Sequence, residues 1–276
     1  MTGPAASGWA LWRRQATVLA RQEVGRSLLG RRVLPVLLLG AMPVGIALLR
    51  ALFLPESQRA HPGHSTTELA QVFHFFVLRF IVFFTTALLF VKLFRGEILE
   101  RSLHYQLLAP LRREVLAVGK YLGGLASAAL AMAATVAATW LLYYLPHGAA
   151  GLAHTASARG LGELAAYLGV TVLACAAYGA LFLLAGLFFR NPMVPAVLFL
   201  GWEVLTPFLP GYLKALSIVH YLGSLAPVPV SQGPFALLVQ PVPGFIAVLA
   251  LVAISAGLVA LAAWRTRTLE VTYSVD

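Results

Sequence analysis

The chain has 276 residues, of which 60% are hydrophobic and only 11% are charged, and its mean hydropathy is +0.84. Soluble domains carry about 25% charged residues, so this composition excludes a soluble globular protein. Several stretches reach the roughly 20 apolar residues that a helix needs to cross a bilayer, whereas the alternating strands of a membrane β-barrel are not seen. We therefore predict an all-α polytopic membrane protein.

The net charge of +10 reflects 20 Lys and Arg residues against 10 Asp and Glu residues. In a soluble protein this excess would suggest nucleic acid as a partner. Here the basic residues flank apolar runs, where they set the orientation of a membrane protein, so we expect membrane lipids and no nucleic acid. The single cysteine, Cys175, excludes a disulfide framework within the chain.

Residues 1–32 form a basic segment that is predicted to be an interfacial amphipathic helix on the cytoplasmic side. Trp9, Trp12 and Leu19 share one side of such a helix, whereas Arg14 and Arg21 lie on other sides. A helix of this kind lies along the inner leaflet with its apolar side in the membrane. The alternative is an ordinary basic tail before the first span.

Residues 33–276 are predicted to form a transmembrane domain of six helices. The predicted spans are Val33–Leu54, Val72–Phe94, Tyr121–Leu145, Leu164–Phe189, Met193–Leu209 and Val242–Trp264. Of the 20 Lys and Arg residues, four fall on the outer side and one within a span, which leaves fifteen on the cytoplasmic side. The outer four are Arg50, Arg59, Arg159 and Lys214. This bias predicts a protein of the cell (inner) membrane with both termini in the cytoplasm.

Between the second and third spans lies a polar, basic and amphipathic loop, residues 95–120. Leu103, Leu107 and Leu111 recur at i, i+4 spacing and give a helix there an apolar edge. Pro110 disfavours helix at Ala109 and ends it there. A short amphipathic helix in water beside the membrane can dock into a groove of a soluble partner.

Residues 210–241 are apolar but are interrupted by proline and glycine, including Pro227, Pro229 and Pro234. Irregular backbone is tolerated at membrane depth only where protein shields it or where it lines a cavity. We predict a re-entrant segment that dips back from the outer side between spans five and six. The alternative is an apolar loop on the outer surface.

Two charged residues, Arg79 and Glu203, fall inside predicted spans. At 1.5 Å per residue both lie roughly 10 Å deep on the same side of the membrane. Such charges are costly in lipid and are usually paired or face water. One hypothesis is an Arg79–Glu203 ion pair or a polar point on a translocation path. The other is that Arg79 extends to the surface while Glu203 caps the re-entrant pieces.

Catalytic motifs are absent from the sequence. The only Gly-Lys is Gly119-Lys120, and Glu114 stands where a phosphate-binding loop needs its first glycine. Neither a His-Glu-x-x-His nor a Gly-x-Ser-x-Gly motif occurs. The outer histidines are scattered and lack a supporting Cys or Met cluster. We therefore predict no catalytic, cofactor-binding or metal-binding residue, and an enzyme acting on lipids is disfavoured.

The loop resembles the cytoplasmic loop of ABC type 2 exporter permeases. That family shows an ordered set of residues that is found here at the expected spacing: Glu97, Ser102-Leu103, Leu107-Leu108, Ala109-Pro110, Arg113 and Gly119-Lys120. His104 and Gln106 are more polar than is usual in the family. The predicted architecture resembles the same family over nearly the whole chain.

The resemblance implies the permease subunit of an ATP-driven ABC exporter, in which a separate ATP-binding subunit carries ATP and Mg and this chain holds no cofactor. It implies a second permease copy, identical or homologous, and a coupling site in the loop. The implied coupling residues are Glu97, Ser102, Leu103, Leu107, Leu108, Ala109, Pro110, Arg112 and Arg113. A non-transporting membrane anchor or assembly subunit is the alternative function, and the sequence does not indicate a substrate.

Overall fold

The computed structural model describes residues 8–30, 33–54, 62–97, 108, 112–189, 191, 193–208, 210–228, 230 and 242–268. Regular structure in these residues is entirely helical, which confirms the all-α class. In chain order the elements are α1 (Gly8–Leu29), α2 (Val33–Phe53), α4 (Pro62–Val72), η1 (Phe73–Ile81), α5 (Val82–Val91), η2 (Lys92–Gly96), α8 (Arg113–Tyr144), η3 (Leu145–His147), α9 (Gly148–Ala156), α10 (Ala158–Phe188), α11 (Met193–Leu205), η4 (Thr206–Phe208), α12 (Gly211–Lys214), α13 (Ile218–Leu225) and α14 (Gly244–Arg267).

Five helices in the described residues are long and apolar enough to cross a membrane, which agrees with the predicted multi-pass protein. They are Val33–Phe53, Ser65–Gly96, Arg113–Ala156, Ala158–Phe188 and Gly244–Arg267. The second of these is a continuous rod in which two stretches, η1 and η2, have π-helical hydrogen bonding. Such stretches are rare in proteins and occur often at functional sites.

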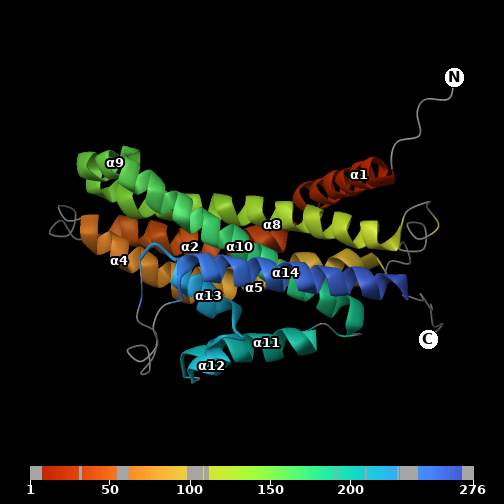
Figure 1. The fold of residues 1–276 in the computed structure, drawn as a ribbon. Helices are drawn as coiled ribbons and strands as arrows, with labels where there is room; N and C mark the ends of the chain where they lie inside the picture. Colours follow the sequence, from red (N-terminus) through yellow and green to blue (C-terminus); the bar gives the residue numbers. More distant parts are fainter. Residues whose placement is uncertain are drawn as a thin grey trace.

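The predicted fifth span, Met193–Leu209, differs from the observed structure. Its helix α11 has only thirteen residues, short of the roughly 20 that cross a bilayer. A 3₁₀ turn, η4, follows and contains Pro207, which cannot donate a helical hydrogen bond. From the end of α10 to the start of α14 the chain therefore passes through short pieces, α11 to α13 (Figure 1).

The core of the bundle lies between α5, α8, α10 and α14, which run side by side in Figure 1. Aromatic rings from α5 and α10 meet edge to face, with the Phe83 centroid 4.9 Å from Phe182 and 5.4 Å from Tyr178. The ring of Phe90 packs directly on Gly179, where a Cβ atom would come within 2.4 Å of it. These contacts fix α5 against α10 along the middle of the bundle.

A row of small residues on α8 lets two other helices approach it closely. A Cβ atom on Gly119 would lie 2.9 Å from the Leu19 Cβ of α1, and one on Gly123 would lie 2.6 Å from the Glu23 Cβ. Farther along α8, Thr135 fits against Gly40 of α2. The N-terminal helix α1, which carries several basic residues, therefore packs directly on the first turns of α8.

Gly123→Ala is expected to destabilise the protein by about 1–3 kcal/mol, because the added methyl group overlaps α1. Gly257→Ala on α14 is the matched control, since a Cβ atom there meets nothing within 4 Å. Replacing glycine by alanine in an open helix position stabilises by about 0.5–1 kcal/mol. Unfolding in detergent should thus give changes of opposite sign. Equal changes for the two variants would refute the close packing of α1 on α8.

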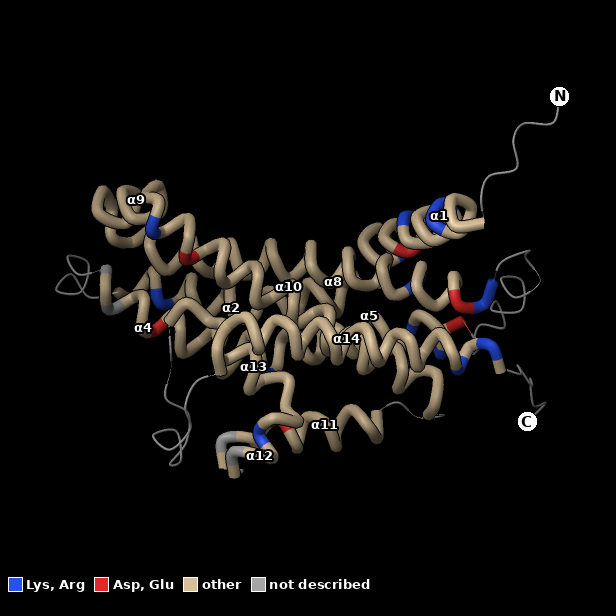
Figure 2. Tube along the Cα trace, in the orientation of Figure 1, with Lys and Arg blue, Asp and Glu red and all other residues tan. Residues whose placement is uncertain are grey.

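Charged residues gather near the two ends of the long helices, as Figure 2 shows. We call the end with α1, the start of α8 and the end of α14 the loop end, because the loop leads into the start of α8 there. The opposite end carries α9 and the start of α10, and we call it the α9 end. The two ends hold different polar clusters.

Candidate functional site

Glu97 lies near the start of the loop of residues 95–120, and its side chain is almost completely buried, with 1% exposure. Its Oε1 atom accepts a hydrogen bond from the guanidinium of Arg26 on α1 at 3.0 Å. The same oxygen lies 2.8 Å from the Nζ atom of Lys120 on α8. One carboxylate therefore joins α1, the end of η2 and the second turn of α8.

Lys120 is the centre of this arrangement and is itself 2% exposed. Its ammonium lies 3.9 Å from the carboxylate of Glu23 on α1 and 5.5 Å from the centre of the Phe94 ring. Glu23, Arg26, Glu97 and Lys120 form what we call the loop-base cluster, which contains two acids and two bases. Buried charges are tolerated when such partners neutralise them, and each ion pair here crosses between elements.

The other end of the loop is anchored as well. The Arg112 guanidinium lies 4.3 Å from the centre of the Trp12 ring on α1, a cation–π contact. Arg113 donates a hydrogen bond to the carbonyl of Arg267 at 3.0 Å. Glu114 forms an ion pair with the Arg267 side chain. The start of α8 is thus attached both to α1 and to the end of α14.

The residues of the predicted coupling site are only partly described. Glu97, Arg112 and Arg113 flank the loop and make the contacts given above. Leu108 is 80% exposed, so an apolar side chain of the loop faces outward. Ser102, Leu103, Leu107, Ala109 and Pro110 lie outside the described residues.

Sequence reasoning missed three of the four residues of the loop-base cluster. The sequence pattern of residues 1–32 does not single out Glu23, and Lys120 stands out only as half of the Gly119-Lys120 pair. Both residues could have been noticed in the sequence. Glu23 borders the apolar side of its helix and Lys120 begins an apolar run, and charged residues in such places need partners. Pairing them required the contact between α1 and α8.

Within the membrane-spanning region, Glu203 on α11 is bound to α13. Its Oε2 atom accepts a hydrogen bond from the Ser217 hydroxyl at 2.5 Å, and its Oε1 atom accepts one from the Ile218 N–H at 3.0 Å. A third bond comes from the Val219 N–H at 3.2 Å. A carboxylate at the start of a helix satisfies its unpaired N–H groups, so the capping alternative describes the contacts of Glu203.

Arg79 is also buried, at 6% exposure, and belongs to the π-helical stretch η1. Its guanidinium lies 5.7 Å from the centre of the Phe75 ring. No direct ion pair joins Arg79 to Glu203 among the described residues, although the two charges attract each other at longer range. The two buried charges therefore differ in their surroundings.

Glu203→Ala is expected to cost more stability than Glu203→Gln, because Ala leaves buried N–H donors of α13 unsatisfied at about 1–3 kcal/mol each. Gln keeps one acceptor oxygen for them. Unfolding of the purified variants in detergent would measure both costs. An Arg79→Met change should not rescue Glu203→Gln, whereas clear recovery in the double variant would support the ion pair instead.

Comparison with known proteins adds no family to these observations. Neither a protein-family model nor a curated protein matches the chain. The likeness to ABC type 2 permeases therefore depends on the ordered residues of the loop and on the helical architecture.

Proposed function

We propose that this chain is the transmembrane permease subunit of an ATP-driven ABC exporter, with ATP hydrolysed on a separate subunit. The observation that carries the proposal is the buried Glu97 carboxylate, bound to both Arg26 and Lys120. It stands at the first position of the ordered motif, near the start of the loop that would receive the ATPase. A contact of this kind gives the loop a mechanical connection to the membrane helices.

In this proposal the ATPase docks on the loop and pushes or pulls it during ATP hydrolysis. Leu108, with its exposed apolar side chain, supplies part of the docking surface. Because the loop-base cluster and the Arg112–Trp12 contact tie α1, η2 and α8 together, a displacement of the loop moves these elements as one body. Rigid-body motion of packed helices is a common way to open or close a transport path.

The proposed topology places the loop end in the cytoplasm and the α9 end outside, in the cytoplasmic membrane. Five long helices and the stretch of α11 and η4 would then make six crossings, with the segment from residue 210 to 241, which contains α12 and α13, re-entering from the outer side. The bias of basic residues toward the loop end supports this orientation. A second permease copy, identical or homologous, and two ATP-binding subunits would complete the exporter.

Labelling of single cysteines from outside sealed cells tests this orientation. We expect a cysteine at position 154 to react with an impermeant thiol reagent and one at position 104 to react only after the membrane is opened. The native Cys175 is fully buried and should give little background. Reaction of position 104 from outside would overturn the topology.

Affinity purification of the tagged chain tests the assignment to ABC exporters. We expect a P-loop ATPase, encoded in a neighbouring reading frame, to copurify with it. A non-transporting anchor would also retain a partner, but ATP hydrolysis by that partner would not depend on this chain. Failure of any P-loop ATPase to copurify would contradict the proposal.

A further inference from the structure

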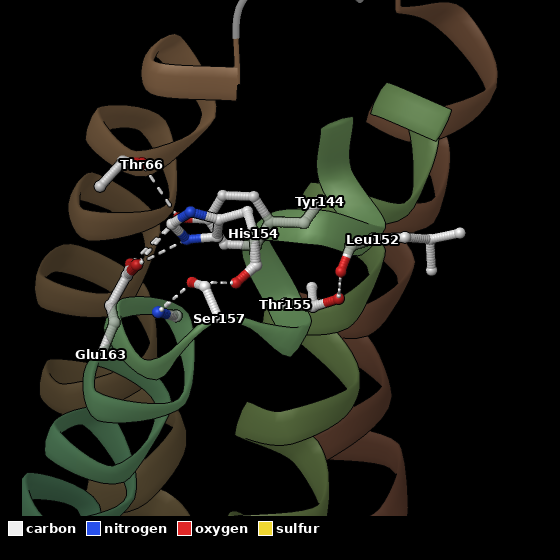
Figure 3. A network of polar contacts seen from close by, with 8 residues as sticks. Thr66, Tyr144, Leu152, His154, Thr155, Ser157 and Glu163 are labelled. Atoms are coloured by element: carbon white, nitrogen blue, oxygen red, sulfur yellow. Dashed lines mark hydrogen bonds and ion pairs between the residues drawn. The ribbon is translucent and has the colours of Figure 1, made fainter. Parts of the chain in front are cut away.

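At the α9 end a cavity of about 430 Å³ opens where α4, α9, α10 and the segment after α13 meet. Its lining includes Thr66, His154, Arg159, Glu163 and Val228. Figure 3 shows the polar side chains of this region converging from different helices. A volume of this size falls within the range of small-molecule sites, about 300–1,000 Å³.

The carboxylate of Glu163 is held firmly in the wall of this cavity. The Tyr144 hydroxyl donates to it and lies 3.1 Å from each oxygen, while the Nε2 atom of His154 lies 3.2 Å from Oε2 (Figure 3). The His154 ring stacks on the Tyr144 ring at 4.4 Å, and Thr66 contacts the Tyr144 hydroxyl at 3.0 Å. The Glu163 side chain keeps 10% exposure, so a ligand can still reach it.

Arg159 lies one turn before Glu163 on the same helix and also lines the cavity. Oppositely charged residues at i, i+4 spacing commonly pair. Here Tyr144 and His154 engage the carboxylate, and Arg159 has no hydrogen-bond or ion-pair partner among the residues that the structure describes. The cavity therefore presents a cation and a fixed anion that do not neutralise each other directly.

We propose that this cavity binds a zwitterionic group, with a phosphate or carboxylate on Arg159 and a protonated amine on Glu163. A purely anionic ligand would leave its charge beside Glu163, and a purely cationic one would leave its charge beside Arg159. The site lies in the first two turns of α10, a helix long and apolar enough to cross a membrane, so in a bilayer it would stand at the level of the lipid headgroups. The zwitterion is either a phosphoethanolamine headgroup of a lipid or a free molecule of the same chemistry.

This site is independent of the proposed transport function, because the ligand would bind the chain whether or not an ATPase is attached. A test on the purified full-length chain therefore separates the two proposals. The useful probe is sn-glycero-3-phosphoethanolamine, which carries both charges and no acyl chains. Glycerol 3-phosphate carries the anion alone.

Gly162 offers a way to fill the cavity without disturbing the fold. It lines the cavity, and a Cβ atom built on it meets nothing within 4 Å, so Gly162→Leu would occupy ligand space. Gly169→Leu is the matched control on the same helix, because a Cβ atom there also meets nothing within 4 Å. Arg159→Gln removes the exposed cation and leaves the Glu163 contacts intact.

In titration calorimetry we expect saturable binding of sn-glycero-3-phosphoethanolamine to the wild-type chain and to Gly169→Leu. Arg159→Gln should weaken this binding about tenfold or more, since a charge-assisted hydrogen bond contributes roughly that much. Gly162→Leu should weaken it at least as much, because its side chain occupies the space of the ligand. No saturable binding to the wild type, unchanged binding to Gly162→Leu, or equal binding of glycerol 3-phosphate would overturn the proposal.

Lipid nanodiscs distinguish the two sources of the zwitterion. If nanodiscs of phosphatidylethanolamine weaken binding of the soluble probe and nanodiscs of phosphatidylglycerol do not, the site holds a lipid headgroup. If both leave binding of the probe unchanged, the site takes a free zwitterion. Either result supports the binding site and assigns its ligand.

Discussion

Lys120→Met is expected to lower the free energy of unfolding by about 3–5 kcal/mol, the cost of breaking a buried ion pair from one side. The change removes the ammonium that pairs with Glu97 and lies near Glu23, both of which are buried. The double variant Lys120→Met with Glu97→Gln should recover part of this loss, because fewer buried charges then lack a partner.

The matched control is Lys92→Met, at an exposed lysine in η2 near the same end of the bundle. Surface substitutions usually change stability by less than about 0.5 kcal/mol. Unfolding curves recorded in mixed detergent micelles for the three variants would give the comparison. Equal stability of Lys120→Met and Lys92→Met would show that the loop-base cluster does not hold α1 and α8 together.

A second large effect is expected on the coupling between the ATPase and this chain. Replacing Leu107 and Leu108 by Asp should release the ATPase or abolish its dependence on the permease, because burying a charge in an apolar groove costs several kcal/mol. Leu108 is 80% exposed, so an aspartate there does not disturb the chain itself. The variant should therefore still insert into the membrane in normal amounts.

Leu152→Asp is the control for this experiment, since Leu152 is also exposed but lies on α9 at the opposite end. The amount of ATPase that copurifies with each variant is the measurement. We expect Leu152→Asp to match the wild type. Unchanged ATPase recovery and unchanged transport in the Leu107/Leu108 variant would remove the coupling role from this loop.

Apolar runs made the long helices predictable, because a helix that crosses a bilayer must satisfy its own backbone and expose apolar side chains. The run after Met193 shows what hydropathy leaves out. It is apolar enough to cross, but hydropathy does not register that Pro207 interrupts the hydrogen bonding, so the helix ends at Leu205.

Partners distant in sequence account for most of what could not be predicted. Arg26 and Glu97 are separated by 71 positions, and nothing local to either residue points to the other. Tyr144 at the end of α8 meets Glu163 near the start of α10 across the turns on either side of α9, of which Gly148, with a φ of +58°, has a conformation that favours glycine. The sequence indicates where polar residues are costly, but their partners come from helices that are distant in sequence, such as α13 for Glu203 and α1 for Glu97.

ATP hydrolysis in proteoliposomes tests the central claim most directly. The ATPase that copurifies with this chain would be assayed alone, with the wild-type chain, and with the Leu107/Leu108 variant. Coupling through the loop predicts that the wild-type chain changes the hydrolysis rate and that the variant does not. A hydrolysis rate that is the same in all three samples would contradict an ABC permease.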